Sequence, residues 1–169
     1  MRVSYKGLIL AGLQLLLVAS LGAKLLMDRA TLPRVWVRAT PYGPNLPIRG
    51  RYISLRLEVQ RPPGVEPANY PENRAALRVE NNQLVAVPAK PGQDGVWIAA
   101  QRPQTPGAPA GVVLQEPVAF FIPERVPDPS RRPRGEELWV EVTVPKKGPP
   151  RPIRLGIKKD SVLTPLSSN

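Results

Sequence analysis

The residue types that could do chemistry are few in this chain of 169 residues. It contains no Cys and no His. Their absence excludes thiolate nucleophiles, Ser-His and Cys-His catalytic pairs, histidine-based zinc sites, disulfides and histidine-ligated haem. The lack of Cys leaves the redox compartment open, because a chain without thiols is compatible with either. Ser, Lys and carboxylate groups are among the residue types that remain for catalysis.

One nucleophile and base can be paired from these residues. Ser54 with Lys90 would form a Ser-Lys dyad. With a hydrophobic N-terminus and an extended apolar strand, the dyad resembles signal peptidases, whose β-rich catalytic domain follows a membrane anchor. However, Ser54 falls on the polar face of a strand, and Lys90 lies between Ala89 and Pro91 with nothing to desolvate it. We keep a divergent signal-peptidase-like hydrolase as a remote alternative.

The carboxylates give no catalytic pattern either. Glu136 and Glu137 are adjacent, so a strand places them on opposite faces, and Glu137 and Glu141 are too far apart along it to share a proton. The sequence shows no metal-ligand cluster and no phosphate-cradling glycine loop. We therefore expect a protein that is not an enzyme and has no catalytic, metal or cofactor-binding residues.

The clearest element that could position functional side chains is the segment 51–59. Its apolar residues alternate with polar ones in the period of two that is typical of a half-buried strand. The apolar residues are Ile53, Leu55, Leu57 and Val59, and they alternate with Tyr52, Ser54, Arg56 and Glu58. Gly50 precedes this strand, and Pro62, Pro63 and Gly64 end it.

The remaining chain also favours strands. All 23 Pro residues fall at or after Pro33, which disfavours long helices beyond that point. Asn81 and Asn82 tolerate positive φ and predict a hairpin turn. A strand bent or broken at Glu116-Pro117 is expected. We predict an all-β domain, a small antiparallel barrel or sandwich. Its other strands are expected at 34–38, 75–80, 83–87, 96–100, 111–114, 118–122, 137–144 and 153–157.

Residues 7–27 form an apolar segment of membrane-spanning length, with Lys24 reaching the headgroups. We expect one N-terminal transmembrane helix that binds the lipid bilayer. The alternative is a cleaved signal peptide with Ser20 and Gly22 before the cut. The expected organisation is an anchor with its flanks at 1–32, a Pro-rich β domain at 33–160 and a C-terminal tail at 161–169.

The net charge of +11 comes mostly from scattered arginines. Because no aromatic stacking motif and no recognition-helix pattern accompany them, we expect no nucleic-acid binding. Anionic lipid or a solvated surface accounts for the charge better. The basic residues cluster only at 131–134 and at Lys146-Lys147, and the polar loop 123–135 is the best candidate for a segment that faces a partner.

Trp36 is the most prominent aromatic residue near the anchor. Alternation in the segment 34–38 places Val35 and Val37 on one face and Trp36 on the other, between Arg34 and Arg38. Two interpretations stay open. Trp36 and the arginines could form a surface at headgroup level, or Trp36 could lie between arginines beneath a neighbouring loop.

The anchor, the short Val-rich strand and the segment 49–57 together resemble the bacterial family named for its GDYXXLXY motif. Gly50, Tyr52 and Leu55 match the motif, whereas Arg51 replaces its Asp and Leu57 its last Tyr. Members of that family are small membrane-anchored proteins, often encoded beside a polytopic membrane protein. The resemblance therefore implies an accessory or assembly partner of such a protein.

These observations predict a single-pass protein of the bacterial inner membrane. The positive-inside count does not decide its orientation, but a short N-terminal tail usually stays inside, so we expect a cytoplasmic N-terminus and a periplasmic C-terminal domain. The alternative function is an extracytoplasmic binding module for an anionic ligand that uses Arg-rich loops. The sequence does not indicate an oligomeric state. The expected interaction residues are Gly50, Arg51, Tyr52, Leu55, Trp36, Arg131, Arg132 and Arg134.

Overall fold

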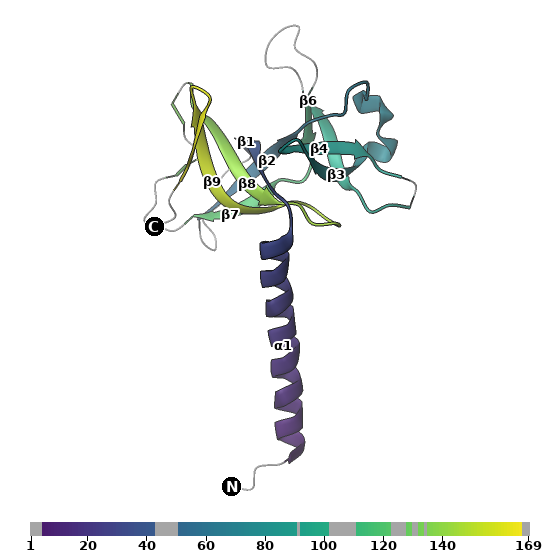
Figure 1. Cartoon of the computed structure of the whole chain (residues 1–169), viewed down its shortest axis with the longest axis vertical. Coiled ribbons are helices and arrows are strands. Elements are labelled where there is room, and N and C mark those ends of the chain that lie inside the picture. The colour runs from purple at the N-terminus through teal and green to yellow at the C-terminus, as the bar shows by residue number, and fades with distance from the viewer. Residues whose placement is uncertain are drawn as a thin grey trace. The chain divides into compact units, whose positions relative to one another are not determined.

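A computed structural model describes residues 5–42, 51–90, 92–101, 111–122, 128–129, 132–133 and 135–166. The chain divides into two compact units, Met1–Leu32 and Pro33–Asn169. The first contains one helix and the second contains all the described strands (Figure 1). The sequence-based prediction of an apolar N-terminal helix followed by an all-β domain is confirmed.

The helix α1 runs from Tyr5 to Thr31 and contains no proline. Its large apolar side chains are exposed on every face rather than along one stripe, which is typical of a helix that requires an apolar surrounding. By length and composition, its segment Tyr5–Met27 is able to cross a membrane. The hydroxyls of Ser20 and Thr31 donate to carbonyls of their own helix, at 2.8 and 2.7 Å, so neither needs water.

The second unit is a ten-stranded antiparallel sheet that curls into a half-barrel, with the strand order β10-β9-β8-β1-β2-β6-β5-β3-β4 and with β7 also paired to β2. Two short 3-10 helices, η1 (Pro67–Asn69) and η2 (Pro71–Asn73), connect β2 to β3. The strands are β1 (Arg34–Pro41), β2 (Arg51–Val59), β3 (Arg74–Glu80), β4 (Gln83–Pro88), β5 (Val96–Gln101), β6 (Gly111–Leu114), β7 (Val118–Ile122), β8 (Glu137–Thr143), β9 (Arg151–Lys159) and β10 (Val162–Pro165).

Strand β2 is the element around which the sheet is arranged. One edge pairs with β1, and the other pairs with β7 along its first half and with β6 at its end. Gln115, Glu116 and Pro117 lie between the two paired segments, so β6 and β7 act as one strand interrupted at Pro117, as predicted. Figure 1 shows β8 and β9 on one side of β1 and β2, and β3, β4 and β6 on the other.

Strand β4, the last strand in the order of the sheet, lies beside the end of β2. Gln60, the residue after β2, forms a parallel bridge with Val85 of β4. Its N–H donates to the carbonyl of Leu84 at 2.8 Å, and its own carbonyl accepts from Ala86 at 2.9 Å. These bonds satisfy the backbone groups of an edge strand that would otherwise be open to pairing. They therefore fix the β3–β4 hairpin beside the end of β2.

One hydrophobic core runs through the curl, and it contains the inward residues of β1, β2 and β8. The apolar residues that alternate in β2 are all buried, as predicted, and so are Leu138, Val140, Val142 and Val144. Tyr70, between the 3-10 helices, is the buried aromatic residue of this core. Its hydroxyl donates to the carbonyl of Ala86 at 2.6 Å. Burial raises the pKa of Tyr70, although the charge of Arg61 opposes that shift.

Two hairpin turns carry the positive φ angles that tight turns require. In the β3–β4 turn the angles are 49° at Asn81 and 59° at Asn82, as the sequence predicts. The β9–β10 turn has 47° at Asp160 and 69° at Ser161. The sequence did not predict the latter hairpin. Strand β10 lies within residues 161–169, which we expected to be a tail, and it pairs with β9 over its whole length.

Candidate functional site

The pairing of β1 with β8 and β9 brings together side chains that are distant in the sequence. Trp36 lies opposite Glu141, and Arg38 lies opposite Trp139. Because these positions alternate with buried valines, their side chains share the face of the sheet that points away from the core. The pairing with β9 adds Lys158 opposite Glu137 on the same face. Aromatic, acidic and basic groups therefore alternate across three strands.

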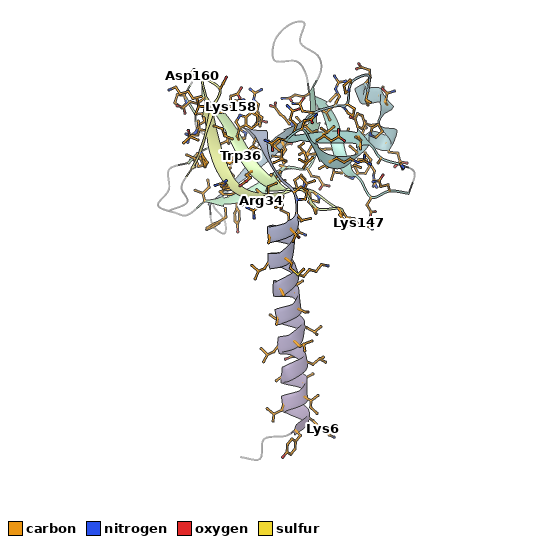
Figure 2. All side chains as sticks on the ribbon, viewed as in Figure 1. Lys6, Arg34, Trp36, Lys147, Lys158 and Asp160 are labelled. Atoms are coloured by element: carbon orange, nitrogen blue, oxygen red, sulfur yellow. The ribbon has the colours of Figure 1, made fainter. Side chains whose placement is uncertain are left out.

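A groove of about 560 Å³ lies over this face, and we call it the β1–β8 groove. Two hairpin turns contribute to its lining, the β3–β4 turn and the β9–β10 turn. Figure 2 labels Trp36, and it labels Lys158 and Asp160 at the β9 end of the sheet. The lining residues are Trp36, Val37, Arg38, Glu58, Gln60, Asn81, Asn82, Gln83, Leu84, Glu137, Trp139, Lys158, Ser161 and Leu163.

Arg38 organises the polar groups of the groove. Its Nη1 lies 3.4 Å from Oε2 of Glu58, and its Nη2 lies 3.3 Å from Oε1 of Glu137. The second oxygen of Glu137 accepts from Nε1 of Trp139 at 3.1 Å, and that of Glu58 accepts from Nε2 of Gln101 at 3.4 Å. One guanidinium thus holds two carboxylates from different strands, and these carboxylates in turn hold neighbouring side chains.

The two tryptophans of the groove are fixed by cations and by the sheet. Nζ of Lys158 lies 4.7 Å from the ring centroid of Trp139. The guanidinium of Arg154 lies 5.3 Å from the ring centroid of Trp36, and its Nε is 2.6 Å from Oε2 of Glu141. Both contacts are of the cation–π kind. Trp36 is therefore half-buried under β9 of its own sheet. The arginine that packs on its ring is Arg154 of β9, and not one of its neighbours in β1.

Tyr52 belongs to a second surface feature. Its ring packs edge to face against Phe121 of β7, with the centroids 5.5 Å apart and the planes at 66°. Both side chains are nonetheless exposed, Tyr52 by 44% and Phe121 by 52%. Further along the same face of β2, the guanidinium of Arg56 lies 3.8 Å from the centroid of exposed Tyr42. We call Tyr42, Tyr52, Arg56 and Phe121 the aromatic patch.

The other expected interaction residues are distributed differently. Leu55 is completely buried, so it packs in the core and presents no surface. Arg51 begins β2, and its backbone pairs with Ile122. Arg132 donates from Nε to the carbonyl of Pro129 at 2.7 Å and lies 3.8 Å from Glu136. The remaining three expected residues, Gly50, Arg131 and Arg134, lie outside the described residues.

The structure thus places Trp36 in the groove and Tyr52 in the aromatic patch. No contact between the two rings occurs in the described part of the chain. The groove residues Glu58, Glu137, Trp139 and Lys158 were not expected as site residues, and Arg38 was expected only as a neighbour of Trp36 in β1. Alternation in β8 could have shown that Glu137, Trp139 and Glu141 share its polar face. Their position against β1 depends on a long-range pairing that no local pattern specifies.

The two members of the hypothetical Ser-Lys dyad lie in different surroundings. Ser54 is half-buried on β2, opposite Ala119 of β7. Lys90 is exposed in the turn after β4, where its backbone N–H donates to the side chain of Gln93. Both residues are described, and no hydrogen bond joins their side chains.

Comparisons of the chain with family models, with curated proteins and with solved structures found no match. The class of molecule that the structure itself defines is an apolar N-terminal helix joined to a curled antiparallel β domain.

Proposed function

We propose that this chain is a single-pass protein of the bacterial inner membrane, anchored by α1, with a cytoplasmic N-terminus and a periplasmic β domain. The all-round apolar surface of α1 supports the anchor, because a helix without a polar face is not stable in water by itself. Lys6 at its start and Lys24 near its end are placed to reach the two headgroup regions. In this proposal the segment is retained and is not cleaved as a signal peptide.

The connection between helix and sheet supports a membrane-proximal role. Only Leu32 and Pro33 separate the last residue of α1 from the first residue of β1. An extended chain of that length spans roughly 7–10 Å. A domain tethered so tightly is restricted to partners at or near the bilayer surface, and a polytopic membrane protein is such a partner.

The observation that carries the proposed accessory role is the aromatic patch. Tyr52 and Phe121 expose about half of their surface although each has a ring neighbour. Exposed aromatic residues beside an arginine are typical of protein interaction surfaces. Tyr52 is also a residue through which the chain resembles the GDYXXLXY family. We infer that the domain is a non-enzymatic accessory or assembly partner that contacts a polytopic protein through α1 and this patch.

The test is affinity purification of the full-length protein, tagged at its C-terminus, from membranes extracted in mild detergent, with mass spectrometry of what is recovered. Three variants are compared with the native chain. The first replaces residues 7–27 by an unrelated membrane anchor, the second is Tyr52→Ser with Phe121→Ser, and the third is Val162→Ser, a matched exposed apolar residue outside the patch.

The proposal predicts that a polytopic protein is recovered with the native chain and with Val162→Ser, and that it is lost or reduced at least severalfold with the other two. Recovery of the chain alone in every case would contradict the accessory role. Equal recovery with all variants would show that neither α1 nor the patch makes the contact.

The alternative, a module that binds an anionic ligand through Arg-rich loops, has less support. Arg132 is the one arginine of the basic cluster 131–134 whose side chain is described, and it is ion-paired with Glu136. Glu136 also lies 3.7 Å from Lys159. A cation that already has a carboxylate partner offers less to an anion, so the accessory role is preferred.

A further inference from the structure

We propose that the β1–β8 groove is a binding site for a neutral polyhydroxylated ligand, an oligosaccharide chain. This inference is separate from the accessory role, which rests on α1 and the aromatic patch. The groove contains three features that such a ligand requires together. They are balanced charge, side chains that both donate and accept hydrogen bonds, and fixed aromatic surfaces.

Among the described residues that line the groove, the charges cancel. Arg38 and Lys158 contribute two positive charges, and Glu58 and Glu137 contribute two negative charges. Arg38 lies within 3.4 Å of both carboxylates. An anion would have to compete with these carboxylates for the guanidinium, and a cation would be repelled by Arg38 and Lys158. A neutral ligand meets neither penalty, which separates this site from the anionic-ligand alternative.

The hydrogen-bonding groups fit hydroxyls. A hydroxyl both donates and accepts, so it needs partners of both kinds. Carboxylates accept only, and arginine and lysine donate only, whereas side-chain amides do both. The groove provides all three kinds, because amides of the β3–β4 turn and Gln60 line it together with the charged network. The Arg38 bridge holds the carboxylates in place before a ligand arrives, which lowers the entropy lost on binding.

Trp36 and Trp139 supply the apolar surface. One face of a sugar ring carries mainly C–H groups, and such a face packs on an indole. The orientation of Trp139 is fixed by its hydrogen bond to Glu137. Nζ of Lys158 lies over the Trp139 ring, 4.7 Å from its centroid, and brings a hydrogen-bond donor to the aromatic surface. Polar and apolar groups therefore alternate along the base of the groove. Hydroxyl groups and C–H faces alternate along a glycan in the same way.

The size is suitable as well. The groove volume of about 560 Å³ falls within the range of roughly 300–1,000 Å³ that is usual for ligand sites. Two tight turns contribute to its walls, and their four residues with positive φ are Asn81, Asn82, Asp160 and Ser161. Such turns are short and stiff, so the spacing of the walls is set by the sheet.

The experiment uses the full chain in phosphatidylcholine vesicles, because detergents with sugar headgroups would compete for the site. The chain has three tryptophans, and Trp97 does not line the groove. In a Trp97→Phe background the fluorescence therefore reports only on Trp36 and Trp139. The probes are the neutral tetrasaccharides chitotetraose and cellotetraose, and the anionic tetragalacturonate. Calorimetry gives the Kd of each.

We expect at least one neutral tetrasaccharide to change the tryptophan emission saturably. Glu137→Gln removes a carboxylate without changing shape, and Asn82→Gly removes an amide while tolerating the φ of 59°. Each should raise the Kd about tenfold, which corresponds to one or two lost hydrogen bonds. Lys147→Gln, a substitution outside the groove, should leave the Kd unchanged. Far-UV circular dichroism shows whether each variant is folded.

Three results would overturn the proposal. The first is the absence of saturable binding of either neutral chain at millimolar concentrations. The second is binding of tetragalacturonate alone, which would make the groove an anion site. The third is binding that both folded variants, Glu137→Gln and Asn82→Gly, leave unchanged, because the ligand would then lie elsewhere. None of these results bears on the purification test of the accessory role.

Discussion

Trp36 of β1 lies directly against Gly156 of β9. A Cβ atom at position 156 would be 2.8 Å from Cζ3 of the indole, closer than packed atoms approach. The side chain missing at this position makes room for the ring, and β9 can therefore cover Trp36 while Arg154 lies over it. One glycine thus sets how deeply a tryptophan of the groove is buried.

We predict that Gly156→Ala lowers the free energy of unfolding by about 1–3 kcal/mol, the usual cost of overpacking. The reason is that the ring or β9 must shift, and the carbonyl of Thr164 is a further close neighbour. Chemical denaturation followed by tryptophan fluorescence measures the change. Gly111→Ala is the control, because the nearest atom there is the mobile end of Gln101. Equal stability of the two variants would contradict the packing account.

The Arg38 bridge gives a second prediction. Arg38→Met leaves Glu58 and Glu137 without their shared cation, and we expect a loss of about 1 kcal/mol, because these groups are partly exposed. The loss should shrink in high salt. Denaturation at two salt concentrations measures it, and Arg78→Met, an exposed arginine of β3, is the control. A salt-independent loss would indicate that packing of the Arg38 stem matters more than its charge.

The raised pKa of Tyr70 predicts that the domain loses stability at alkaline pH. Burial raises its pKa above the ordinary value of 10.0. Its contribution to stability is therefore complete below the unfolded pKa and is lost as the pH rises through the folded pKa. Tyr70→Phe should flatten the pH dependence above pH 10.0 and, through the lost bond to Ala86, cost about 1–2 kcal/mol at neutral pH. Identical alkaline profiles for the two proteins would contradict this role.

Asp94 gives a prediction at acidic pH. Its hydrogen bond and ion pair with Lys147, at 3.0 Å, lower the pKa of Asp94. The contribution is present above the unfolded pKa and is lost as the pH falls through the folded value. Lys147→Ala should return the pKa of Asp94 toward 3.8, as followed by NMR titration of its carboxyl carbon. Lys146→Ala should not change it, and an effect of equal size there would point to general charge instead.

Much of the fold follows from local pattern. Strict alternation in β2, the Asn81-Asn82 turn and the interruption at Pro117 all depend on neighbouring residues, and each is found in the structure. In β8 the predicted inward residues are buried as well, although Glu141 and Thr143 of the other face are also covered. Strand β10 was not predicted because it has only four residues and ends in Pro165. The signal that could have found it is Asp160-Ser161, a turn sequence that tolerates positive φ.

The groove could not be predicted in the same way. Its residues come from five parts of the chain. The pairings of β1 with β2 and β8, the pairing of β8 with β9 and the Gln60 bridge to β4 bring them together. Such pairings are set by burial of the whole sheet and not by the spacing of the residues that line the groove. The sequence selected Trp36 with its neighbours Arg34 and Arg38, whereas the partners on other strands were identified only through the fold.

The central claim is that α1 stays attached as a membrane anchor. The direct measurement is the intact mass of the C-terminally tagged full-length protein, recovered from membranes after a carbonate wash. The account predicts membrane-bound protein whose mass includes the whole of Tyr5–Met27. Carbonate-released protein whose mass corresponds to a chain that begins after Gly22 would show a cleaved signal peptide, and it would contradict the claim.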